Sequence, residues 1–204
     1  MGRDVHHVRH TELVAVLLGA TGMSMPVAAH TYKPERELTI QLDDQGEAAL
    51  WELSMGGPQA AVLFAAGDLD HNGELSEGER TVLAVSMLTK AVGGVSLTWD
   101  GEALTRAHLQ PRLDGAGRVL TARGLTELKL EGQSVRCGAH VLRIRLEPRA
   151  ALLGVDVRAL GGWRVDGIAA GGLHEATLPV VLAPNEYLDV RVSETCAATP
   201  LEKP

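Results

Sequence analysis

The residues whose types and spacing could do chemistry lie together, between Asp68 and Glu79. In this segment, DLDHNGELSEGE, oxygen-bearing side chains occupy alternate positions and are followed by Gly73. Calcium is a hard cation that takes about six to eight oxygen ligands at about 2.3–2.6 Å. Alternate residues of a tight loop can point at one ion, and a glycine permits the sharp turn that this needs. The segment therefore predicts a calcium site.

Each predicted ligand has a defined role in this site. Three side chains near the start of the segment can offer one oxygen each. Further along, a backbone carbonyl and a water held by a serine can fill the next positions, and a final glutamate can close the shell with both carboxylate oxygens. The predicted ligands are, in this order, Asp68, Asp70, Asn72, Glu74, Ser76 and Glu79.

The end of the same segment, Ser76 to Glu79, also fits the S-x-x-E pattern of a capping box. We expect Ser76 to cap the first turn of a following helix. Glu79 either reaches back to Ser76 or turns toward the metal, so that helix entry and metal binding share one carboxylate. Acidic side chains in a first turn also suit the helix dipole.

The segment matches D-x-[DN]-x-[DN]-G-x₅-E at every fixed position and resembles the EF-hand family over about residues 58–92. Helix signals on both sides support the resemblance: apolar residues 58–66 precede the loop, and residues 77–92 follow it until two glycines. We expect the first helix to be buried. The chain carries no second loop of this kind, which predicts sub-millimolar to millimolar affinity, as in extracellular modules.

A wider resemblance runs from about residue 30 to 192. A strand hairpin, an apolar helix, an Asp-rich loop and a Trp99-Asp100-Gly101 turn follow one another. This order resembles the extracytoplasmic domain that precedes the membrane helices of HupE/UreJ-type proteins, which are associated with nickel or cobalt transport and with hydrogenase or urease maturation. The resemblance implies an exported β domain with an Asp-rich helical insert, and it does not imply transport.

The positions around the helices predict a mainly β (α+β) fold. Apolar and polar residues alternate in short runs that turns separate, which is typical of an antiparallel β-sandwich-like domain. The helix–loop–helix at 58–92 is then an EF-hand insert in one domain covering 30–204. The expected strands are 35–42, 48–55, 95–99, 127–130, 141–146, 155–158, 163–165, 176–182 and 187–192.

The amino terminus fits an export signal. Arg3 and Arg9 precede an apolar stretch, Leu13 to Met23, and Val27-Ala28-Ala29 supplies small residues for cleavage after Ala29. The alternative is a short amphipathic arm, because Asp4 and Glu12 depart from a purely basic leader. The signal reading makes 1–29 a signal peptide and the mature protein periplasmic or extracellular. No other segment reaches the roughly 18 apolar residues of a transmembrane span.

The two cysteines, Cys137 and Cys196, both fall in the predicted mature chain. In an oxidising compartment an even pair favours one disulfide, and the alternative is two unrelated thiols. The formal net charge of −7 and the absence of a basic run argue against a nucleic-acid partner.

These observations favour a non-enzymatic, exported calcium-binding domain that the metal rigidifies for an envelope or extracellular partner. No G-x-S-x-G, H-E-x-x-H, P-loop or dinucleotide motif supports an enzyme, although a hydrolase with an unrecognised site is a second alternative. The first alternative is a periplasmic copper or nickel protein. Its metal would bind the mature amino-terminal His30 together with another histidine from His108, His140 or His174.

Overall fold

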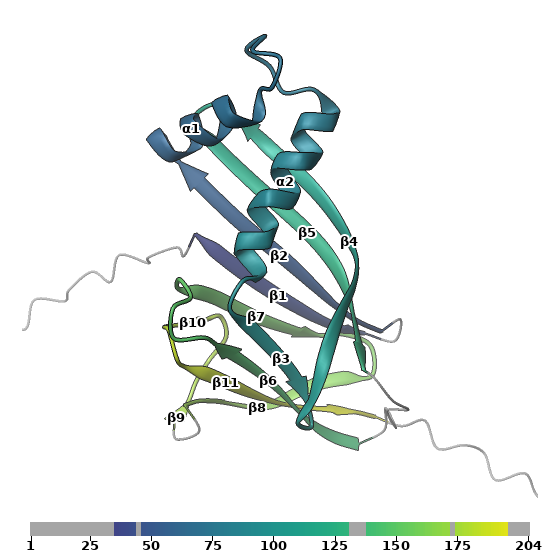
Figure 1. Ribbon diagram of the computed structural model, residues 1–204. Helices are drawn as coiled ribbons and strands as arrows, with labels where there is room; N and C mark the ends of the chain where they lie inside the picture. The colour runs from purple at the N-terminus through teal and green to yellow at the C-terminus, as the bar shows by residue number, and fades with distance from the viewer. Residues whose placement is uncertain (1–34, 44–45, 131–137, 172–173, 196–204) are drawn as a thin grey trace, which may run out of the picture. The chain divides into compact units, whose positions relative to one another are not determined.

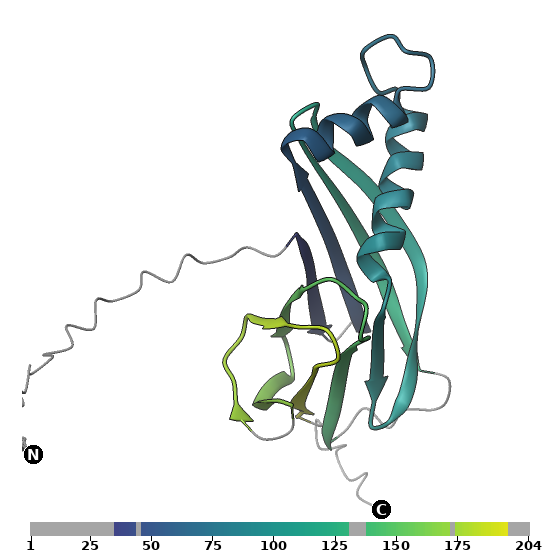
Figure 2. The same ribbon diagram turned by 60° about the vertical axis from the view of Figure 1, so that its left-hand side comes forward.

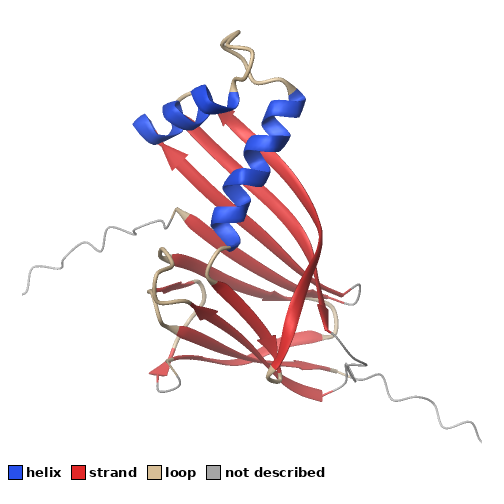
Figure 3. Ribbon diagram, in the orientation of Figure 1, coloured by secondary structure: helices blue, strands red, loops and turns tan. Residues whose placement is uncertain are grey.

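The computed structural model describes residues 35–43, 46–130, 138–171 and 174–195. Every described residue belongs to one compact unit, within Lys33–Pro204. Strands dominate this unit, and two helices stand between the second and third strands (Figures 1 and 3). The prediction of a mainly β fold is therefore confirmed.

Eleven strands form one sheet, in the order β10-β7-β1-β2-β5-β4-β3-β6-β11-β8-β9. Very short strands, β9 and β10, stand at its two ends, which limits the unpaired edge open to aggregation. The elements in chain order are β1 Arg36–Asp43, β2 Gly46–Gly56, α1 Gly57–Gly67, α2 Glu77–Val92, β3 Val95–Trp99, β4 Glu102–Ala116, β5 Val119–Leu130, β6 Gly138–Leu146, β7 Leu153–Ala159, β8 Trp163–Ala170, β9 His174–Glu175, β10 Val180–Leu182 and β11 Tyr187–Glu194.

The sheet is mixed, because β1 and β7 pair in parallel, from Glu37 opposite Gly154 to Leu42 opposite Ala159. The prediction of a purely antiparallel domain is wrong at this pair. A parallel pair needs a long connection between its strands, and here the two helices and five further strands intervene. The other pairs of described strands are antiparallel.

The core is one cluster of apolar side chains from the strands, both helices and the loop between the helices. Alternation along the strands builds it, as in β1, where Leu38, Ile40 and Leu42 are buried and their neighbours are not. Trp51 on β2 is fully buried and donates its indole N–H to Thr126 Oγ1 at 3.3 Å. Trp99 and Trp163 belong to the same core and are 4% and 5% exposed.

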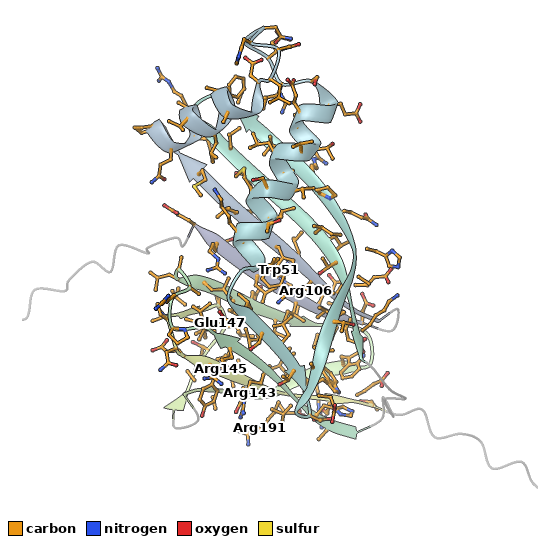
Figure 4. The ribbon with its side chains drawn as sticks, in the orientation of Figure 1. Trp51, Arg106, Arg143, Arg145, Glu147 and Arg191 are labelled. Carbon is orange, nitrogen blue, oxygen red and sulfur yellow. The ribbon has the colours of Figure 1, made fainter. Side chains whose placement is uncertain are left out.

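One long strand, β4, is missing from the sequence prediction. It contains Pro111, which cannot donate to a ladder and argues against a strand. Beyond Ala103, however, β4 pairs only with β5, so this part of the strand is an edge that tolerates proline. Just beyond the residues of β4 that pair with β3, Arg106 donates a hydrogen bond to the Val95 carbonyl. Its Cζ lies 4.9 Å from the centroid of the Trp51 ring (Figure 4).

The predicted strand 176–182 is wrong over its first part. In the region from residue 174 to 182, only β9 (His174–Glu175) and β10 (Val180–Leu182) are strands. The residues between them belong to no strand. This intervening part contains Pro179, which has no N–H for a ladder.

The helix α2 lies across β2, β5 and β4 (Figure 2). Its buried side chains include Leu83, Met87 and Leu88, whereas Val82 and Val85 are 65% and 41% exposed. The expectation that the residues of α1 are buried is wrong, since only Ala60 of this helix is buried. Both helices expected at 58–92 are present, and the assignment of their loop as an EF-hand stays a prediction.

Candidate metal centre

The loop between α1 and α2 brings together three carboxylates that are separate in the sequence. Asp68 follows the last turn of α1, and its N–H donates to the Phe64 carbonyl at 3.0 Å. Glu79 lies in the first turn of α2. One oxygen each from Asp68, Asp70 and Glu79 lies within 4.8 Å of the others, the only such group of His, Cys, Asp or Glu side chains among the described residues.

Asp68 is the buried member of the group, with 7% of its surface exposed. Its Oδ1 accepts the N–H of Asn72 at 3.1 Å, and its Oδ2 accepts the N–H of Gly73 at 2.9 Å. The chain turns back here through positive φ angles of 56° at His71 and 86° at Gly73. These two hydrogen bonds hold the Asp68 carboxylate in place within the loop when no ion is bound.

Glu79 joins the beginning of the loop to its end. Its Oε1 accepts the N–H of Leu69 at 2.7 Å, and its Oε2 accepts the N–H and the hydroxyl of Ser76 at 2.8 and 2.7 Å. Ser76 Oγ accepts the N–H of Glu79 at 3.4 Å, which completes the predicted capping box. The Glu79 carboxylate therefore accepts hydrogen bonds from the capping residue Ser76, and it still lies close to the carboxylates of Asp68 and Asp70.

The remaining predicted ligands, Asn72, Glu74 and Ser76, are not members of this carboxylate group. Asn72 donates its side-chain amide to Asp70 Oδ2 at 2.8 Å, and its Oδ1 accepts the N–H of Glu74 at 2.7 Å. This amide oxygen therefore already has a partner, and it would serve a cation through its second lone pair. The side chain of Glu74 is exposed, as expected for a residue whose backbone carbonyl is the predicted ligand. The ligand roles of Asn72, Glu74 and Ser76 stay predictions.

A small apolar contact fixes the two helix ends that carry the loop. Leu75 is 6% exposed although it lies in the loop, and Leu83 of α2 is equally buried. Gly67, the last residue of α1, is close to both, because a Cβ there would come within 2.9 Å of Leu83 Cδ2 and 3.3 Å of Leu75 Cδ2. An alanine at this position would require the ends of the Leu83 and Leu75 side chains to shift.

The hydrogen bonds of Glu79 predict a defined pH dependence. The Ser76 hydroxyl and then the N–H groups of Ser76 and Leu69 lower the pKa of Glu79 below its ordinary value of 4.5. A carboxyl whose folded pKa lies below its unfolded pKa stabilises the fold above the unfolded value, and this contribution is lost as the pH falls through the folded value.

In calcium-free buffer, the Tm of Glu79→Gln should therefore fall less than that of the wild type between about pH 6 and pH 3. Glu74→Gln removes the same charge from an exposed side chain and is the matched control. A pH profile of Glu79→Gln that runs parallel to the wild type would contradict the role of these hydrogen bonds.

Several other candidate residues lie elsewhere. His30, Cys137 and Cys196 fall outside the described residues, so the amino-terminal metal site and the disulfide stay predictions. His140 places Nδ1 2.7 Å from Asp100 Oδ2, and its ring lies 5.1 Å from that of Trp99. The sequence analysis missed this pair, because a distance of forty residues along the chain hides a contact that strand pairing creates.

No family model matches the chain, and no curated protein matches it. None of the helices in the described part of the chain combines the length and apolar character needed to cross a membrane.

Proposed function

We propose that this chain is an exported, non-enzymatic β-rich protein that binds one Ca²⁺ at the loop between α1 and α2. The observation that carries the proposal is the convergence of Asp68, Asp70 and Glu79 within 4.8 Å in a loop with EF-hand spacing. Three carboxylates supply hard oxygen ligands and enough negative charge to offset a divalent cation. The predicted oxygens of Asn72, Glu74 and a water on Ser76 would complete a shell of about seven.

The proposed role of the ion is mechanical. Asp68 is attached to the end of α1, whereas Glu79 belongs to the first turn of α2. An ion held by both carboxylates connects the two helices, and α2 in turn packs on β2, β5 and β4. Bound calcium would thereby fix the angle between the helices and hold them against the sheet. A surface stiffened in this way loses less conformational entropy when a partner binds.

Calorimetric titration with calcium and with magnesium tests this proposal. We expect calcium to bind with a Kd of about 0.1–1 mM, in the range of weak extracellular EF-hand sites. Magnesium should bind more weakly, because it demands a small, near-ideal octahedron and gives up its waters reluctantly. Equal heats for the two ions, or no heat from calcium at several millimolar, would contradict a shaped calcium site.

Export, the disulfide and the envelope or extracellular partner belong to the same proposal. The strand register supports the disulfide, because Gly138, next to Cys137, pairs across β6 and β11 with Glu194, two residues before Cys196. A bridge at this end of the sheet would stabilise the fold by about 2–4 kcal/mol.

A further inference from the structure

A groove with two hollows runs beside the helices, away from the carboxylate loop. One hollow, of about 410 Å³, lies at the carboxyl end of α2 and reaches residues 147–151. The other, also of about 410 Å³, lies along α1. Glu35, Met55 and Lys90 line both hollows, so the two adjoin each other. Each has a volume within the usual range of small-molecule sites.

The hollow along α1 is mainly apolar, and its polar lining residues are Glu35, Gln59 and Lys90. Its lining residues include Met55 of β2 and Pro58, Val62 and Leu63 of α1. The helix carries no charged residue between Gly57 and Gly67, and Val62 is 69% exposed. A helix at the surface of a soluble domain normally turns a charged or polar face outward. This apolar wall therefore suits the hydrocarbon part of a ligand.

The other hollow contains a buried cation. Arg36 of β1 is 5% exposed and lines it. The guanidinium donates to the carbonyls of Ala91, at 3.0 and 2.7 Å, of Gly93 at 2.8 Å and of Ala151 at 3.0 Å. Nη1 makes one of these bonds, so one of its two N–H groups has no hydrogen-bond partner among the described residues.

The charge of Arg36 is only partly offset. It forms no ion pair with a carboxylate among the described residues, and burial lowers its pKa. Its helix partners, the carbonyls at the end of α2, carry the equivalent of roughly half a negative charge. The charges of the other side chains that line the hollow cancel. Lys90 and Arg149 are positive, and Glu35 and Glu147 are negative. Of these four, Glu147 is labelled in Figure 4. The base of the groove is therefore left with a net positive charge.

We propose that this groove binds a small amphiphilic carboxylate, such as a medium-chain fatty acid. The carboxylate lies beside Arg36 and Lys90, where it accepts the remaining Nη1 N–H and replaces water next to a buried cation. The hydrocarbon chain extends along α1 over Met55, Val62 and Leu63. The groove does not involve the calcium loop, so this inference stands apart from the proposed function.

Titration of the full chain with octanoate, below the concentration at which it forms micelles, tests the inference by calorimetry or NMR. We expect saturable binding of one octanoate, with octanol binding at least tenfold more weakly. Val62→Asp should weaken octanoate binding by roughly tenfold or more, because it places a charge and its water on the apolar wall. Lys90→Gln should weaken it by about two- to fivefold, the effect of one exposed charge pair.

Two controls make the outcome decisive. Lys129→Gln removes an exposed lysine of β5 that does not line the groove, and it should leave binding unchanged. Vesicles of phosphatidylglycerol test for membrane binding. We expect octanoate to bind, and we expect any binding of the chain to vesicles to be the same in the wild type and in Val62→Asp. Octanol binding as tightly as octanoate would overturn the charged half of the site. Octanoate binding that Val62→Asp leaves intact, or no binding at all, would overturn the whole inference.

Discussion

Replacing Glu79 with glutamine should abolish the rise in Tm that calcium produces in the wild type. With a Kd of about 0.1–1 mM and about 10 mM calcium, mass action stabilises the folded state by about 1.4–2.7 kcal/mol. For a domain of this size, that corresponds to a rise in Tm of about 3–10 °C. Glu79 is the predicted ligand that supplies two oxygens and joins α2 to the site, so its neutral amide should reduce the shift to near zero.

The calcium-free fold of the variant should remain largely intact. A glutamine also serves in a capping box, so Ser76 keeps a partner for its backbone N–H. The amide has only one oxygen, however, whereas the carboxylate accepts from both Leu69 and Ser76. Losing one of these exposed hydrogen bonds should reduce the free energy of unfolding only slightly, because water replaces the lost partner. The calcium response and the stability without calcium are thus separable by scanning calorimetry with and without the ion.

Glu77→Gln is the matched control for this variant. Glu77 lies in the same first turn of α2, and its replacement by glutamine removes the same charge. It lies outside the carboxylate group of Asp68, Asp70 and Glu79. It should keep a calcium-dependent shift close to that of the wild type. If both variants lose the shift equally, calcium acts through diffuse charge near the helix start. If Glu79→Gln keeps it, the loop is not the binding site.

The local features of the loop were predictable from the sequence because short-range chemistry sets them. The boundaries of α2 follow from Ser76, which caps its start, and from the glycines after Val92. The buried position of Leu75 follows from its place in the loop pattern. These features need only neighbours a few residues away.

The predictions failed where distant parts of the chain decide the outcome. The sequence of α1 is apolar enough for a buried helix, yet the neighbouring elements cover only one side of it, at Ala60. The strand β4 tolerates Pro111 because no strand pairs with that side. The parallel pairing of β1 with β7 depends on how the whole sheet closes. No local pattern carries this information.

Arg36 shows the same limit at a single residue. In the sequence it is a charged residue at the start of a predicted strand, where an exposed position is the ordinary expectation. In the structure it joins β1 to the end of α2 and to the segment that precedes β7. The carbonyls that it binds lie 55 to 115 residues away, and only the folded chain brings them together.

Replacing Arg36 with methionine should therefore reduce the free energy of unfolding by about 3–5 kcal/mol, because three carbonyls lose a charged hydrogen-bond donor. Methionine fills a similar length of space but leaves the carbonyls of Ala91, Gly93 and Ala151 without their donor. Burying unsatisfied carbonyls costs about 1–3 kcal/mol each, and water entering from the groove offsets part of this. Urea denaturation, with an unchanged m-value, measures the loss.

Arg158→Met is the matched control, because Arg158 on β7 is 65% exposed and forms one ion pair with Asp156. It should change the free energy of unfolding by less than about 0.5 kcal/mol. Arg36→Lys should fall between the two variants, since an ammonium cannot reach all three carbonyls in the planar fork of a guanidinium. A loss below about 1 kcal/mol in Arg36→Met would mean that water solvates these carbonyls readily. The groove beside α2 would then be wet at its base, and the attraction of Arg36 for a carboxylate would be correspondingly weak.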